Sequence, residues 1–452
     1  MTPYGCNTCV GDEPNVLSAK TQSQKSNLQF LLSFIWCVIR VFVWCIVHSM
    51  RYLLSSFFII LSLACGSPNS GAPVSVMVLV PVEKQGGFEF EPRRQQLTTI
   101  SDISKLEGSV TSLIGGARMF WDDNDPKLNA AQSIEEIKKA LFKKEGGSVR
   151  AQFIEKDGVL WPTDFHSWAM VTTYWNLEQA FLYFQEMYDG RATEELLNVP
   201  TYYWLDTNMM NPDEKESNTD NAFFHGAFRM MAVLPFKDFQ TIPMSINIGV
   251  MAHEYAHFVF DARVHHADID SDTHTDPDKA PAVILDSLNE GLADFHAYGV
   301  TRRLNPQGSV RSFEWTLDEK EANRRDFSDP KKCWSTLEHQ NIYTIGTLFA
   351  ASFYQAAMEV GKFDSMAKFI IHAYDSNAIG KPPGIRQHYI QNAETPQNIS
   401  LESVADVFLA HITDNDLKRR TCNQLLDRFA FEKEYLPNCP ESSASNNQCG
   451  NK

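Results

Sequence analysis

The stretch that decides the fold is INIGVMAHEYAHFVF, residues 246–260, which contains the motif HExxH with His253, Glu254 and His257. No proline interrupts the segment and apolar residues flank the motif, so the pattern predicts a helix over residues 244–260. On a helix, residues four positions apart lie on one face, and both imidazoles can therefore bind one metal ion. The glutamate beside the first histidine can hold and deprotonate a water molecule at that ion.

A catalytic zinc site needs a third protein ligand and leaves its fourth position open to water. The segment NEGLAD, residues 289–294, offers Glu290 as this ligand. Asp294 lies four residues later, on the same helical face, where it can accept the free N–H of a ligand imidazole. An ordinary solvated helix face is the alternative for this acidic pair. We therefore expect zinc to be held by His253, His257 and Glu290.

HExxH followed downstream by NExxxD resembles the gluzincin metallopeptidases, in particular the thermolysin-like family. Further segments are similar to that family in the same order: NAFFHG at 221–226, IPMS at 242–245, RDFSDP at 325–330 and YTIGTL at 343–348. The similarity covers residues 164–360. It implies the zincin fold, with a β-rich N-terminal lobe, a mainly helical C-terminal lobe and the HExxH helix between them.

The same resemblance implies that Asn221 and Ala222 hold the substrate backbone and that Arg325 contacts the substrate carbonyl. The family's oxyanion-stabilising histidine has no direct counterpart here, because the two matching positions hold isoleucine and tyrosine. Tyr343 is our candidate donor, since a tyrosine hydroxyl plays this part in related zinc aminopeptidases. His339, one helical turn earlier, is the second candidate, and a packed core ring is the alternative for Tyr343.

Calcium binding is expected to differ from that of the family. The family's calcium-binding aspartate within the active-site helix corresponds to Gly249 here. The segment HHADIDSDTHTD, residues 265–276, has alternating aspartates whose oxygens can bind calcium. No glycine or distal glutamate completes an EF-hand loop, and an acidic surface loop beside the cleft is the alternative. Zinc is therefore the cofactor that we expect, and calcium stays open.

The order of the elements predicts the α+β class, because strands dominate the first half of the chain and helices the second. We expect a strand at 74–82, helices at 133–144 and 164–188, and strands at 201–205 and 223–234. After the HExxH helix, helical periodicity predicts segments at 284–303, 340–360, 363–374, 401–411 and 416–430. The mature chain then divides into a tether (66–73), a β-rich lobe ending in the HExxH helix (74–260), a helical lobe (261–440) and a flexible tail (441–452).

The N-terminus is predicted to direct export. A positively charged start, an apolar run of about a dozen residues and small residues before a cysteine are typical of a secretory signal. The triplet ACG at residues 64–66 resembles the lipobox of bacterial lipoproteins, whose cysteine, here Cys65, becomes the lipidated first residue. We interpret residues 50–65 as this signal and residues 1–49 as an upstream extension, which predicts a lipid anchor in the outer membrane or periplasm. A transmembrane anchor over residues 30–47 is the alternative.

The composition excludes some classes of protein. With 43% hydrophobic and 21% charged residues, the 452-residue chain is typical of a globular protein. A formal net charge of −16 argues against nucleic-acid binding, which uses a basic surface. Cys333, Cys422, Cys439 and Cys449 follow the signal, and an even number permits two disulfides in an exported protein. Pairing among the last three would tie down the C-terminal tail.

These observations predict a zinc metallopeptidase, a hydrolase of peptide or protein substrates, and most directly an endopeptidase. The first alternative is a zinc aminopeptidase, although no GxMEN-like segment that would bind a substrate N-terminus precedes the motif. The second is a lipid-anchored binding protein with an inactive site. The missing histidine favours that alternative, while Glu254 and the full ligand set oppose it. The cleavage preference and the oligomeric state stay open.

Overall fold

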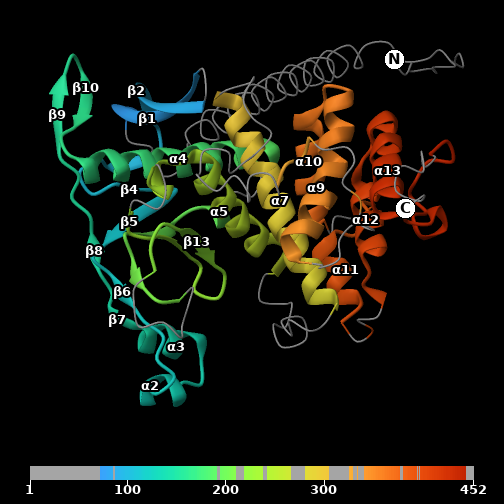
Figure 1. Cartoon of the computed structure of the whole chain (residues 1–452), viewed down its shortest axis with the longest axis horizontal. Coiled ribbons are helices and arrows are strands. Elements are labelled where there is room, and N and C mark those ends of the chain that lie inside the picture. Colours follow the sequence, from blue (N-terminus) through green and yellow to red (C-terminus); the bar gives the residue numbers. More distant parts are fainter. Residues whose placement is uncertain are drawn as a thin grey trace, which may run out of the picture. The chain divides into compact units, whose positions relative to one another are not determined.

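The computed structural model describes most of the chain between residues 72 and 443. The described ranges are 72–84, 87–190, 194–209, 218–237, 242–265, 280–304, 325–328, 333, 341–376, 380–393, 395 and 398–443. Within them every strand lies between Val74 and Val233, and helices make up nearly all regular structure from Met244 onward (Figure 1). The fold is thus a mixture of strands and helices, as the sequence predicted at this coarse level.

Two sheets form most of the strand-rich part. The smaller has the order β2-β1-β10-β9, with β1 at Val74–Lys84, β2 at Gly87–Leu97, β9 at Phe153–Lys156 and β10 at Val159–Pro162. The larger has the order β13-β14-β11-β5-β4-β3, with β8 paired to β5. Its strands are β3 (Ile100–Asp102), β4 (Glu107–Gly108), β5 (Thr111–Gly115), β8 (Gly147–Ser148), β11 (Val199–Tyr203), β13 (Ala222–His225) and β14 (Met230–Val233). Strand β13 is therefore an edge strand of the larger sheet.

The single strand predicted over residues 223–234 is wrong, because two strands and a turn occupy this segment. Strands β13 and β14 pair antiparallel, with Ala222 opposite Val233 and His225 opposite Met230. The turn between them closes where the Arg229 N–H donates to the Gly226 carbonyl at 3.0 Å, and Arg229 has a φ of 44°. Arginine has no special preference for this left-handed region, so the one signal of the turn among these residues was Gly226.

A small third sheet and two short helices lie beside the rest of the strand-rich part, and we call this group the satellite. The sheet has the order β12-β6-β7, with β6 at Arg118–Met119, β7 at Phe142–Lys144 and β12 at Asp206–Thr207. The helices are α2 (Pro126–Asn129) and α3 (Ile134–Leu141). The helix predicted over 133–144 ends at Leu141, because the next three residues pair as β7 with β6.

Helix α4, Phe165–Met187, lies between the smaller sheet and the helical part. The Asp164 carboxylate caps it by accepting the Ser167 N–H at 2.9 Å. Apolar residues surround the helix on all sides, and it contacts β1 and β10 as well as α5 and α7. A helix that is apolar all round must be buried, and α4 accordingly forms the centre of the large hydrophobic core.

The remaining helices follow the predicted order, and α11 is an addition to it. They are α5 (Ile248–Phe260), α7 (Ala280–Leu304), α9 (Ile342–Glu359), α10 (Phe363–Asp375), α11 (Ile385–Gln391), α12 (Leu401–His411) and α13 (Asn415–Phe429). A 3₁₀ turn at Met244–Ile246 precedes α5, and a π-helical turn at Asp261–His265 follows it. Two more 3₁₀ turns lie at Glu194–Leu196 and Lys433–Tyr435. Helix α5 contacts α4, α7 and β13, which places it between the strands and the C-terminal helices (Figure 1).

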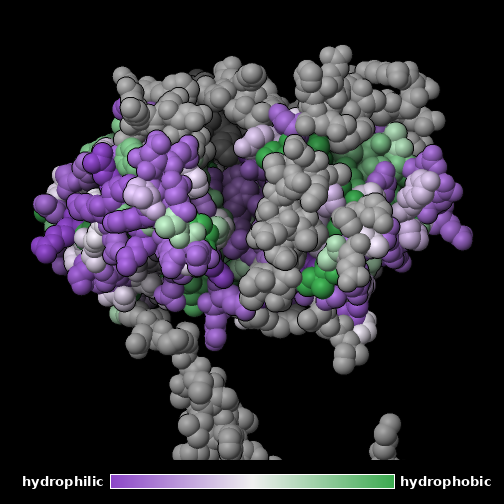
Figure 2. Space-filling model, turned by 90° about the horizontal axis from the view of Figure 1, so that it is seen from below, coloured by the Kyte–Doolittle hydropathy of each residue, from purple (hydrophilic) through white to green (hydrophobic). Residues whose placement is uncertain are grey.

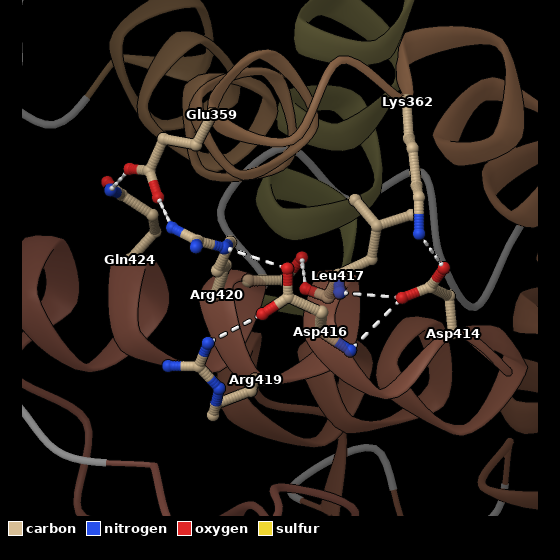
Figure 3. Close-up of polar contacts among 9 residues, drawn as sticks. Glu359, Lys362, Asp414, Asp416, Leu417, Arg419, Arg420 and Gln424 are labelled. Atoms are coloured by element: carbon tan, nitrogen blue, oxygen red, sulfur yellow. Dashed lines mark hydrogen bonds and ion pairs between the residues drawn. The ribbon is translucent and has the colours of Figure 1, made fainter.

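Charged contacts join the C-terminal helices, and a disulfide links α13 to the segment after it. Arg420 on α13 pairs with both Glu359, at the end of α9, and Asp416 on its own helix (Figure 3). Lys362 pairs with Asp414, which caps α13 (Figure 3). A disulfide joins Cys422 to Cys439, and this is one of the predicted pairings near the tail.

The described surface seen in Figure 2 is mainly hydrophilic, with small apolar patches between hydrophilic residues. Among the described helices, none has the length and apolar character that a membrane span requires. Several predictions fall outside the described residues: Cys65, His339, Cys449 and the candidate calcium loop from residue 266 onward.

Candidate metal centre

Helix α5 carries the HExxH residues of the centre. The Asn247 side chain caps it by accepting the N–H groups of Gly249 at 2.9 Å and Val250 at 3.2 Å. The helix is buried on nearly every side, and His253 and Glu254 are 3% and 8% exposed. Two buried polar side chains are stable only when each has hydrogen-bonding or ionic partners.

The two imidazoles face each other through their Nε2 atoms. Those atoms lie 2.8 Å apart, and the Nδ1 atom on the other side of each ring is engaged by an oxygen. His253 Nδ1 lies 3.0 Å from Asp294 Oδ1, and His257 Nδ1 lies 2.8 Å from Asn289 Oδ1. When each ring is neutral, as metal binding requires, these oxygens accept the N–H of Nδ1 and both Nε2 lone pairs point to one place.

Glu290 on α7 completes the group. Its Oε2 atom lies 3.4 Å from His253 Nε2, and its Oε1 atom lies 3.8 Å from His257 Nε2. One ligand atom from each of the three residues lies within 4.8 Å of the other two. Two imidazole nitrogens and one carboxylate are the donor set of catalytic zinc sites. The three residues that the sequence singled out therefore meet in space and could hold one metal ion.

Arg325 lies behind this group and joins its acids. Its Nη1 atom is 3.1 Å from Asp294 Oδ1 and its Nη2 atom is 3.5 Å from Glu290 Oε2. Its guanidinium also lies over the ring of Tyr343, 4.5 Å from the centroid. Arg325 is 7% exposed, so its positive charge balances the two carboxylates inside the protein. Tyr343 is thus adjacent to the centre through Arg325.

Glu254 reaches the centre from α5 and is anchored by the edge strand. Its Oε2 atom accepts the backbone N–H of Phe224, on β13, at 2.7 Å. Asn221 and Ala222 lie at the start of this strand, and the Ala222 N–H donates to the Asn221 side chain at 2.8 Å. The predicted substrate-binding segment and the predicted base are therefore neighbours.

Burial controls the pKa of the base. It raises the pKa of Glu254 to about 7, against the lowering effect of His253. Burial by itself would lower the pKa of His253, but the hydrogen bonds to Asp294 and Glu290 outweigh it and raise that pKa to about 9. The neighbouring carboxylates thus favour a positive charge at the place where the side chains of His253, His257 and Glu290 meet.

The other two candidate ligands, His257 and Glu290, have the protonation states that bind a metal ion. Burial, together with the charge of His253, lowers the pKa of His257 to about 4. Burial by itself would raise the pKa of Glu290, but the neighbouring His257, His253 and Arg325 lower it to about 2. At neutral pH a neutral imidazole and an ionised carboxylate are therefore ready as ligands.

Two groups that hold the side chains of the centre were not predicted from the sequence. Asn289 orients His257, and its place beside Glu290 in the NExxxD segment was the available signal. The Phe224 N–H that holds Glu254 left no signal, because a backbone group is the same in every residue. Conversely, the structure places His225 and Phe228 together near the centre, with rings stacked at 4.1 Å, which indicates a packing role for that histidine.

Comparison with known proteins gives little further guidance. No protein-family model and no curated protein matches the sequence. Among solved structures, the precursor of protealysin, a metalloproteinase from Serratia proteamaculans, is similar with a TM-score of 0.41 and 13% sequence identity. The matched region covers 68% of this chain and 84% of that chain. At this distance we draw no functional conclusion from the likeness.

Proposed function

We propose that this protein is a zinc-dependent peptidase, most directly an endopeptidase. The observation that supports it is the convergence of two Nε2 atoms and the Glu290 carboxylate on one place, with both Nδ1 atoms held from behind. His253, His257 and Glu290 would hold the zinc ion. When bound, zinc lowers the pKa of a coordinated water and polarises a peptide carbonyl.

Glu254 is the general base of the proposal. It is buried beside the ligands, and the Phe224 N–H fixes its Oε2 atom. A carboxylate with a pKa near 7 is well matched to taking a proton from water and passing it to the leaving amine at neutral pH.

The edge strand and the Arg325–Tyr343 pair complete the proposed site. An extended peptide can add to the outer edge of β13 at its Asn221–Ala222 end, and such docking reads the backbone more than the side chains. We assign the Tyr343 hydroxyl to the developing oxyanion, since Arg325 fixes its ring beside the centre. Arg325, held by Asp294 and Glu290, adds positive charge on the same side.

The test is hydrolysis of a quenched-fluorescent peptide library by residues 66–452, with a zinc chelator and zinc add-back. We expect internal cleavage that the chelator abolishes and zinc restores. Trimming from free N-termini alone would indicate an aminopeptidase instead. No cleavage by protein that contains zinc would contradict the proposal and favour the binding protein.

The Glu254→Gln variant tests the base directly. The amide keeps the shape and can still pack beside the ligands, but it cannot take a proton. We expect one zinc ion per chain, as in the wild type, and a kcat lower by at least about 100-fold. Glu155→Gln, on the exposed strand β9, is the matched control and should leave kcat unchanged. Substantial activity in Glu254→Gln would exclude this role.

We also propose export as a lipoprotein attached through Cys65. The Cys422–Cys439 disulfide supports this, because such bonds persist in oxidising compartments outside the cytosol. N-terminal mass spectrometry of the native protein should find a lipidated Cys65 as the first residue. Peptides from residues 1–49 in the mature protein would contradict it.

A further inference from the structure

The turn of the β13–β14 hairpin is held from several directions. Its closing bond joins the Arg229 N–H to the Gly226 carbonyl, and the Arg229 guanidinium lies 5.7 Å from the ring centroid of Phe258 on α5. A Cβ at Gly226 would lie 2.9 Å from an Asp261 carboxylate oxygen, so the turn also touches the end of α5. One side of the turn therefore rests on the metal-binding helix.

Strand alternation places the two faces of the hairpin against different partners. Ala222, Met231 and Val233 belong to the large core that includes α5. Phe223 and Met230, on the other face, pack in the satellite core, where α3 contributes Ile137 and Leu141. The hairpin is thus sandwiched between α5 and the satellite (Figure 1).

Lys138 on α3 makes the polar contact from the satellite to the turn. Its Nζ atom donates to the Phe228 carbonyl at 3.1 Å and lies 6.0 Å from the centroid of the Phe228 ring. The same ring stacks on His225, with the centroids 4.1 Å apart. The lysine is half-buried and Phe228 is 6% exposed, so water competes poorly for this charge-assisted hydrogen bond.

The turn lies two residues from Phe224, whose N–H holds the Glu254 carboxylate. The far end of the hairpin is fixed independently, because the Leu234 N–H donates to the Asn221 carbonyl at 2.8 Å. A shift of the turn therefore moves the anchor of Glu254 more than it moves Asn221 and Ala222.

We propose that Lys138 is a positioning residue for the general base. By fixing the Phe228 carbonyl, it fixes the turn, and through β13 the amide that orients Glu254; this role rests on the proposed peptidase function. The lysine lies outside the metal centre and touches none of its ligands in the described structure. Its removal should therefore affect the proton-transfer step more than the binding of zinc or of substrate.

The test compares Lys138→Met with Lys138→Arg. Methionine keeps the apolar stem and removes the donor, while arginine can still donate to the Phe228 carbonyl. We expect Lys138→Met to lower kcat per zinc-loaded chain about three- to tenfold, with KM and zinc affinity within about twofold. Lys138→Arg should restore most of kcat. Lys139→Met, at the exposed neighbouring lysine, is the matched control and should behave as the wild type.

Hydrogen exchange gives a readout that does not depend on activity. In Lys138→Met, peptides that cover residues 221–234 should exchange faster than in the wild type, while peptides from α7 should be unchanged. Unchanged exchange in the hairpin, or a kcat loss that follows thermal stability alone, would overturn the proposal. An inactive wild type would contradict the peptidase function, and the exchange data would then still decide whether Lys138 fixes the hairpin.

Discussion

At the scale of single residues, the centre depends on which nitrogen each histidine presents. Asp294 and Asn289 occupy the Nδ1 side of His253 and His257, and the two Nε2 atoms are thereby directed to the same place. The spacing of HExxH and NExxxD was enough to predict that His253, His257, Glu290 and Asp294 would lie together, because helical geometry follows directly from sequence separation. The partner of His257 and the anchor of Glu254 depend on how α5, α7 and β13 pack, which spacing alone does not determine.

A buried histidine outside the candidate ligand set should make stability depend on pH. His296 on α7 is 1% exposed, its Nδ1 atom lies 3.0 Å from the Tyr183 hydroxyl, and burial lowers its pKa to about 3. A histidine in the unfolded chain has a pKa near 6.5. Below that pH the unfolded chain therefore binds a proton at this residue, whereas the folded chain does not. The free energy of unfolding should therefore fall as the pH falls from 6.5, by about 1 kcal/mol per pH unit from this residue.

The measurement is chemical denaturation of the wild type and His296→Gln between pH 7.5 and 4.5, both with chelator. Their difference isolates His296, because His257 contributes equally to both proteins. The wild type should lose stability more steeply than the variant below pH 6.5. Parallel curves would contradict a neutral, buried His296.

At the scale of elements, α7 and α9 approach unusually closely where two glycines meet. A Cβ at Gly291 would lie 2.0 Å from the Gly346 carbonyl oxygen, and a Cβ at Gly346 would lie 2.2 Å from that of Ser287. Both obstacles are backbone atoms, which cannot rotate away. The crossing lies beside Glu290 and one turn from Tyr343, so it determines how closely the third ligand and the candidate oxyanion donor approach the centre.

Gly291→Ala and Gly346→Ala should each push the helices apart. We expect a loss of about 1–3 kcal/mol in the free energy of unfolding, as for other overpacked sites, together with weaker zinc binding because Glu290 moves. Thermal denaturation and chelator competition measure both effects. Gly147→Ala is the control, since a Cβ there meets nothing within 4 Å. A Gly346→Ala protein as stable as the wild type would show that the helices do not cross so closely.

Element prediction succeeded where periodicity is long. The ranges 363–374 and 401–411 agree within one residue with α10 and α12, because each helix has a clear apolar face. The short strands β3, β4, β6 and β8, of two or three residues, are too brief to show alternation. The turn of the β13–β14 hairpin was missed because Gly226 is a single turn residue within an apolar run and the positive φ falls on Arg229 instead.

At the scale of the whole molecule, an ion pair joins α13 to the end of α9, and a disulfide joins α13 to the segment that follows it. The Cys422–Cys439 bond spans a sequence separation of 17 residues and connects α13 to the segment after it. The mixture of strands and helices could be predicted from the order of the elements, because the described strands all lie before Met244 and most helices lie after it. The sheet order, with parallel pairs between distant strands such as β5 and β11, could not, since it depends on contacts far apart in sequence.

Removal of this disulfide should destabilise the protein. A closed loop of this length lowers the entropy of the unfolded chain, and the Cys422→Ala/Cys439→Ala double variant should lose about 3 kcal/mol in the free energy of unfolding. Thermal denaturation of the double variant against the wild type measures this. Zinc affinity should stay the same, because α5 and α7 hold the ligands. Equal stability of the two proteins would contradict a structural role for the bond.

The anchor of Glu254 belongs to a different part of the molecule from the three candidate ligands. His253, His257 and Glu290 lie on α5 and α7, whereas the amide that holds Glu254 lies on β13. A small hinge movement of the hairpin away from α5 would leave all three ligands in place and release the base. In the proposed peptidase, metal binding and bond cleavage would therefore be separable within one centre, and a segment that displaced β13 would make that enzyme latent without removing its zinc.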